Sequence, residues 1–149
     1  GILDRCVFVG WTNPKVCHRI IDVFLDTFPV GNGLSAGESM SIGIPIVSME
    51  KIHNLKQYIF EPVRKGWFGE EQKKKFDEIT KDGGYFSYTN RDDYIATAVR
   101  LASDKEFHKK ASEVSLALAF AFLFDAKAAA TIFVDVIDDI VKRKRLGPP

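Results

Sequence analysis

The stretch DVFLDTFPVGNGLSAGESMSIGIPIVSM, at residues 22–49, decides the fold of this 149-residue chain. Short β-branched or aromatic runs at 22–25 and 45–48 are bounded by turn-forming residues, a pattern typical of strands buried in a sheet. Between them lie a glycine-rich loop and a helical pattern over 35–42, which Ser35 can start. A strand, a helix and a second strand in this order predict parallel strands joined by a right-handed crossover.

The same alternation extends in both directions from this stretch. Residues 6–9 (CVFV) and 84–88 (GYFSY) have the composition of further buried strands. Helices are predicted over 14–21, with Asn13 as the cap, and over 70–81, which is polar and charged. The remainder of the chain is rich in Ala and long apolar residues at helical spacing, which predicts three more helices. We therefore expect one α/β domain over 1–149, with a Rossmann-like short parallel sheet flanked by helices and a helical C-terminal segment.

Composition limits the kinds of partner. The 21 Lys and Arg residues nearly balance 20 Asp and Glu, so the net charge of +1 gives no overall field to attract nucleic acid or an anionic membrane. The longest apolar run, at 116–124, is about half of the ~20 residues that a membrane span needs. The two cysteines form no disulfide framework, which favours a reducing, cytoplasmic compartment. Because no signal peptide is visible and the first residue is Gly, we interpret the chain as a piece of a longer protein.

The loop GNGLSAGE at 31–38 is the first candidate site. Ligands of parallel α/β sheets bind outside the carboxyl ends of the strands, and this loop follows such an end. Gly31 and Gly33 allow positive φ and a close approach of the backbone to a ligand. The first N–H groups of the next helix, near Leu34 and Ser35, carry the positive end of the helix dipole, which suits a phosphate.

Other interpretations of this loop remain open. It can be an ordinary strand-to-helix turn in which Gly37 allows tight packing, and Ser35 can either cap the helix or contact a phosphate oxygen. No GK[ST] follows, and Ala36 takes the third glycine place of GxGxxG, so neither nucleotide fingerprint is complete. Glu38 can reach a pair of ribose hydroxyls, or it can serve only as a carboxylate that stabilises the helix dipole.

These residues resemble the donor-binding segment of glycosyltransferases with two Rossmann-like halves, the GT-B architecture. The resemblance is greatest to the O-linked N-acetylglucosamine transferase group and its bacterial relatives. In that pattern a strand ending in FLD, here Phe24 to Asp26, leads through a Gly/Asn-rich turn to a helix with an acidic residue and then to GxPxV. Upstream, PKVCH at 14–18 is similar to the family's PKxxH, and downstream Tyr94 matches a Tyr-containing helix. LASD at 101–104 and a late FD at 124–125 are further counterparts.

The resemblance implies the C-terminal, donor-binding half of a hexosyltransferase, with a uridine diphosphate sugar as the expected donor. It implies two groups of binding residues. Those bordering the base and ribose would be Asn13, Lys15, His18 and, in place of the family's base-contacting Arg, Arg19; those facing the diphosphate would be Asn32, Gly33, Leu34 and Ser35, with Glu38 at the ribose hydroxyls. Because Gly33 and Leu34 replace side chains that bind phosphate in the O-linked branch, main-chain amides would be the main phosphate ligands.

No cofactor or metal is expected, because the sequence has no DxD triplet and its isolated histidines lack metal-like spacing. The reaction implied is displacement of the nucleoside diphosphate from the anomeric carbon by an acceptor protein or glycan. The catalytic base and the acceptor site are expected in a missing N-terminal half, so this chain alone should bind without catalysis. Two alternatives stay open: a non-catalytic nucleotide-binding or regulatory module of the same fold, and a sugar-nucleotide epimerase-like domain.

Overall fold

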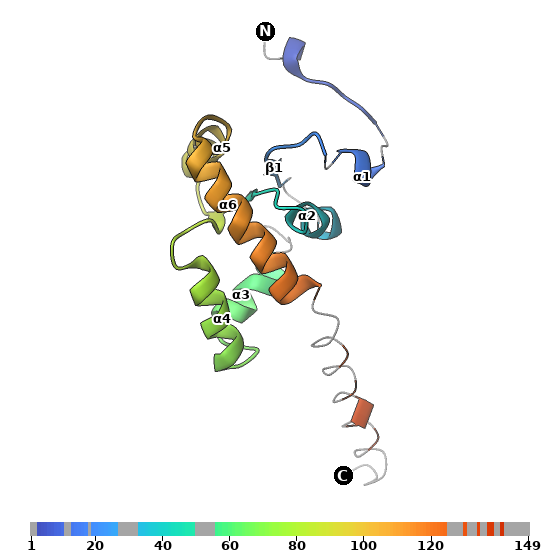
Figure 1. Cartoon of the computed structure of the whole chain (residues 1–149), viewed down its shortest axis with the longest axis vertical. Helices are drawn as coiled ribbons and strands as arrows, with labels where there is room; N and C mark the ends of the chain where they lie inside the picture. Colours follow the sequence, from blue (N-terminus) through green and yellow to red (C-terminus); the bar gives the residue numbers. More distant parts are fainter. Residues whose placement is uncertain are drawn as a thin grey trace.

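The computed structural model describes residues 3–10, 13–17, 19–26, 33–49 and 56–124, together with positions 130, 134, 137, 138 and 141. Within these ranges the chain is a mixed α/β fold in which helices flank a short parallel sheet (Figure 1). The strands are β1 (Phe24–Leu25), β2 (Ile46–Met49) and β3 (Phe86–Tyr88). The α-helices are α1 (Pro14–Cys17), α2 (Gly33–Met40), α3 (Glu61–Arg64), α4 (Glu70–Thr80), α5 (Arg91–Ser103) and α6 (Lys105–Leu118). Shorter helical segments are η1 (Leu3–Arg5), η2 (Lys56–Phe60) and η3 (Ala119–Leu123).

The three strands lie in the order β1-β2-β3, and both pairs are parallel. Phe24 pairs with Ile46, and Val47 is the partner of Leu25 on one side and of Phe86 on the other. The central strand β2 is buried over its first three residues, as expected when helices cover both faces of a parallel sheet. The strands predicted at 22–25, 45–48 and 84–88 are therefore confirmed, with β1 shorter than expected.

The core is divided between the two faces of the sheet. Ile46 and Val47 are adjacent on β2 and belong to different buried clusters, because successive side chains of a strand point to opposite faces. The cluster around Ile46 contains Ala36, Met40, Phe60, Val63, Phe76, Val114, Leu118 and Ala119. The cluster around Val47 contains Phe86, Leu101 and Ala111. Thus α2 covers one face and α5 the other, while α6 contributes to both clusters.

Segments far apart in the sequence meet in the first of these clusters. The ring of Phe60 in η2 lies 6.3 Å from the ring of Phe76 in α4 and 6.0 Å from that of Tyr85, just before β3. Phe122, in η3, lies 6.3 Å from Phe60 and 6.1 Å from Phe76. These tilted and edge-to-face ring pairs join the middle of the chain to the segment that follows α6.

The strand predicted at 6–9 is wrong. Residues 6–10 form no strand, and the side chains of Val7 and Phe8 are 82% and 89% exposed. A β-branched run becomes a strand only where a neighbouring strand takes up its backbone hydrogen bonds. Within the described residues, this segment has no such neighbour in the sheet, which contains β1, β2 and β3.

Most of the predicted helices are present in the structure. The charged helix over 70–81 is confirmed as α4, the helix over 35–42 begins and ends earlier, as α2, and that over 14–21 is reduced to α1. Of the three C-terminal helices, α5 and α6 are confirmed, and the described positions beyond 124 are helical. None of the helices in the described ranges combines the length and the apolar character needed to cross a membrane.

Candidate functional site

The candidate site lies where β1 ends and α2 begins. Because β1 and β2 are parallel, Asp26 and Met49 mark the same edge of the sheet, the carboxyl edge. Residues 27–32, which contain the predicted site residue Asn32, lie outside the described residues. After them α2 starts at Gly33 and packs its buried residues against the sheet and α6. The carboxyl edge is where parallel α/β folds bind ligands.

The first turn of α2 faces solvent. Gly33, Leu34 and Ser35 are exposed, Leu34 to 76%, whereas Ala36 and Gly37 behind them are buried. The first N–H groups of a helix have no partners within it and carry the positive end of its dipole. The first turn contains no acidic residue to offset this charge. This end of α2 can therefore accept an anionic group.

Two details of the loop differ from the expectations. Gly33 is helical and is not among the described residues with positive φ, while Gly31 lies outside the described residues. Since α2 begins at Gly33, Ser35 is its third residue, and the proposed cap role of Ser35 is wrong.

Glu38 lies on the second turn of α2 and is half-buried. Because it is beyond the first turn, its alternative role as a first-turn carboxylate that stabilises the dipole is wrong. Gly37 is buried, which agrees with a packing role. The structure thus brings Gly33, Leu34, Ser35 and Glu38 together on one helix.

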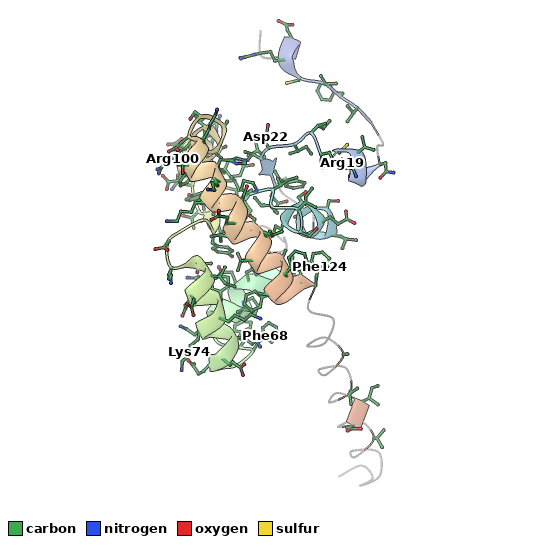
Figure 2. The ribbon with its side chains drawn as sticks, viewed as in Figure 1. Arg19, Asp22, Phe68, Lys74, Arg100 and Phe124 are labelled. Carbon is green, nitrogen blue, oxygen red and sulfur yellow. The ribbon has the colours of Figure 1, made fainter. Side chains whose placement is uncertain are left out.

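The residues expected at the base lie on a separate segment before β1. The carbonyl of Asn13 accepts hydrogen bonds from the N–H groups of Val16 (2.9 Å) and Cys17 (3.2 Å), so α1 begins where the sequence predicts. Lys15 is on this helix, and His18 lies outside the described residues. Arg19 is exposed in the turn that follows α1 (Figure 2). Their roles at the base remain predictions.

Asp26 and Tyr94 also lie at the carboxyl edge of the sheet. From the sequence, both were named only as parts of the matched motifs, with no role assigned to them. Asp26 is only 4% exposed at the end of β1. The Tyr94 hydroxyl, from α5, donates a hydrogen bond to the carbonyl oxygen of Asp26 (3.3 Å). Burial, and then the negative charge of Asp26, raise the pKa of Tyr94 above its ordinary value. Nothing in the local sequence indicates this contact, because the two residues are 68 positions apart.

The described part of the chain also has a cleft that lies away from the carboxyl edge of the sheet. A cleft of ≈ 630 Å³ is lined by Gly84 and Phe86 at the start of β3, and by residues near the end of α5 and in α6. It therefore lies at the amino edge of the sheet. On its rim the Arg100 guanidinium lies 3.9 Å from the ring centre of Phe107 and 3.4 Å from Asp104. Other acidic and basic side chains line the cleft as well, among them Lys109 and Lys110. Because charges of both signs are mixed there, the carboxyl edge, where ligands of parallel α/β folds bind, is the better candidate.

Metal ligands do not gather in the described part of the chain: no group of three His, Cys, Asp or Glu side chains is placed there to hold an ion.

No protein-family model, no curated protein and no solved structure matches the chain. Its function is therefore inferred from the chain's own sequence and geometry.

Proposed function

We propose that this chain is the donor-binding half of a GT-B-like glycosyltransferase. The enzyme would transfer a sugar from a nucleoside diphosphate sugar, with uridine as the expected nucleoside, to a protein or glycan acceptor. The observation that carries the proposal is the exposed first turn of α2 at the carboxyl edge of a parallel sheet. It lies in the stretch that resembles the family's donor-binding segment.

The proposed chemistry is stabilisation of the leaving group. The amides of Gly33, Leu34 and Ser35 would bind the diphosphate, whose negative charge increases as the bond to the anomeric carbon breaks. Glu38 lies five residues after Gly33, which places it about 7 to 8 Å further along the helix axis. This spacing suits a ligand that has a diphosphate at one end and a ribose diol at the other. The chain would thus orient the donor and stabilise the departing nucleotide.

A second half would complete the enzyme. We assign no catalytic residue to this chain; the acceptor site and the catalytic base belong, in this proposal, to a second Rossmann-like half. The cleft between the halves would bring the acceptor hydroxyl or amide to the anomeric carbon. Turnover is accordingly expected from the two-domain parent and not from this chain alone.

Calorimetric titration with uridine diphosphate tests the proposal. The same titration is repeated with the guanosine and adenosine diphosphates and in the presence of EDTA. Binding that prefers uridine and persists in EDTA would support it. Absence of binding by both this chain and its full-length parent would refute it, and binding by the parent without sugar transfer would favour the regulatory-module alternative.

Substitution of Glu38 tests where the nucleotide binds. Glu38→Ala should weaken uridine diphosphate binding by about 1–3 kcal/mol, because the ribose loses a charged hydrogen-bond acceptor. Glu71→Ala is the matched control, since Glu71 is a carboxylate in the first turn of α4, a helix that lies apart from β1 and α2 in Figure 1. Equal affinities of Glu38→Ala and the unsubstituted chain would remove Glu38 from the site.

A further inference from the structure

The turn between α3 and α4 holds two large aromatic side chains in solvent. Trp67 and Phe68 are 73% and 57% exposed, and both belong to residues 65–69, which we call the aromatic turn. Figure 2 labels Phe68 at the end of the described body opposite Arg100 in α5. Large apolar side chains exposed singly are common on protein surfaces, whereas neighbouring ones indicate a contact surface.

The backbone of the aromatic turn is fixed by hydrogen bonds on both sides of the rings. The N–H of Gly66 donates to the carbonyl of Val63 (2.9 Å), a residue of the buried core. The N–H of Gly69 donates to the carbonyl of Gly66 (3.0 Å), so the chain reverses across the two aromatic residues. Both glycines have positive φ, +75° and +98°, a conformation that glycine adopts without strain. A fixed turn therefore presents the rings to solvent.

Unpaired charges of both signs border the two rings. The Lys65 ammonium lies 5.5 Å from the ring centre of Trp67, and Glu70 opens α4 directly after the turn. Neither Lys65 nor Glu70 forms an ion pair with another residue in the described ranges. By contrast, Lys73 is paired with Asp77 (2.6 Å). A cation and a carboxylate beside the rings are thus free to pair with a partner.

This arrangement has the composition of a protein–protein contact. Tryptophan is enriched among the side chains that carry most of the binding energy in such contacts, and a polar rim around them excludes water. Glu70 and Glu71 follow the rings directly, which opposes contact with an anionic membrane. The surface is also complementary to itself, because a two-fold axis through the rings places Lys65 of each copy opposite Glu70 of the other.

We propose that the aromatic turn is the contact between two copies of this chain. Trp67 and Phe68 lie at its centre, and Lys65 of each copy pairs with Glu70 of the other. Fully covered aromatic side chains bury about 150–250 Å² each, so the interface is small, in the class of transient contacts below about 1,200 Å². The dimer accordingly forms and dissociates with concentration. The inference does not depend on the proposed donor site.

Analytical ultracentrifugation over a series of concentrations measures the association. The unsubstituted chain should pass from monomer to dimer, and Trp67→Ser should raise the dimer Kd at least about tenfold, as expected for a central aromatic side chain. Val99→Ser is the matched control, because Val99 is 60% exposed on α5, which lies apart from α3 and α4 in Figure 1. It should leave the dimer Kd unchanged. Circular dichroism checks that each variant is folded.

An exchange of charges tests the geometry of the contact. Lys65→Glu alone brings two carboxylates together at each pair, and Glu70→Lys alone brings two ammonium groups together. Each variant should therefore dimerise about threefold to tenfold more weakly than the unsubstituted chain. An equimolar mixture of the two variants has opposite charges at both pairs, so it should associate within about threefold of the unsubstituted chain.

The outcomes decide the proposal. A monomer at every concentration would refute it, as would a dimer that Trp67→Ser leaves intact or that Val99→Ser weakens as much. Charge variants that do not recover on mixing would refute the pairing of Lys65 with Glu70 and the two-fold arrangement with it. Binding of the monomer to phosphatidylserine vesicles, lost in Trp67→Ser, would assign the aromatic turn to a membrane surface instead.

Discussion

Two adjacent glycines between α4 and β3 allow a sharp test of the packing of α6. Gly83 and Gly84 both have positive φ, +89° and +93°. A Cβ atom added at Gly84 would lie 2.8 Å from the Cβ and Cγ2 atoms of Val114 on α6, whereas one added at Gly83 would meet no atom within 4 Å. Alanine at either position therefore imposes the same unfavourable backbone, but only Gly84→Ala also forces a collision.

The two effects have different magnitudes. A residue with a Cβ at positive φ costs about 1–2 kcal/mol, which should be the whole cost of Gly83→Ala. Overpacking costs about 1–3 kcal/mol more, because Val114 is branched at the clashing atom and lies in the core, where it cannot move aside cheaply. We therefore expect Gly84→Ala to lower the free energy of unfolding by about 2–5 kcal/mol.

Urea denaturation followed by circular dichroism measures these differences, with equal m-values as the check that compactness is unchanged. Val114→Ala supplies the second arm, because it removes the two methyl groups that the new Cβ would meet and keeps only the Val114 Cβ contact at 2.8 Å. In the Val114→Ala background, Gly84→Ala should cost less than in the unsubstituted chain, because the methyl clashes are gone and a smaller side chain can shift, but still more than Gly83→Ala. Equal losses for the two glycine variants in the unsubstituted chain, or no coupling between positions 84 and 114, would show that Gly84 is not packed tightly against Val114.

Three further predictions concern stability. Phe60→Ala should cost about 3–5 kcal/mol in urea denaturation, because Phe60 is fully buried among aromatic rings, and Phe60→Leu should cost less. Asn90→Ala should cost about 1 kcal/mol, since the Asn90 side chain accepts the N–H of Asp93 at the start of α5, and Asn90→Ser should recover most of the loss. The pKa of Tyr94 is raised above its ordinary 10.0, so its stabilising contribution is complete below pH 10 and is lost as pH rises through the folded pKa. The difference in unfolding free energy between the unsubstituted chain and Tyr94→Phe should accordingly shrink above pH 10, and a constant difference would contradict this assignment.

Local pattern predicted much of the architecture. The apolar runs at 45–48 and 84–88 became β2 and β3, and the charged pattern at 70–81 became α4, because a buried strand and a surface helix each have a characteristic composition. The run at 6–9 has the same composition as those strands but remains outside the sheet. Strand formation requires a partner strand, and composition alone does not say whether one is present.

The same contrast holds for the candidate site, where some features follow from the local sequence and others from tertiary packing. The sequence predicted a helix that carries Ser35 and Glu38 after a strand, because that depends on neighbours in the chain, but it assigned Gly33 to the preceding loop, whereas α2 begins at Gly33. The contacts of Tyr94 with Asp26 and of Gly84 with Val114 depend instead on tertiary packing. Those contacts join residues of separate elements, and they arise only when parallel crossovers bring α5 and α6 against the strands. A contact of that kind depends on the packing of whole elements, which no short stretch of sequence encodes.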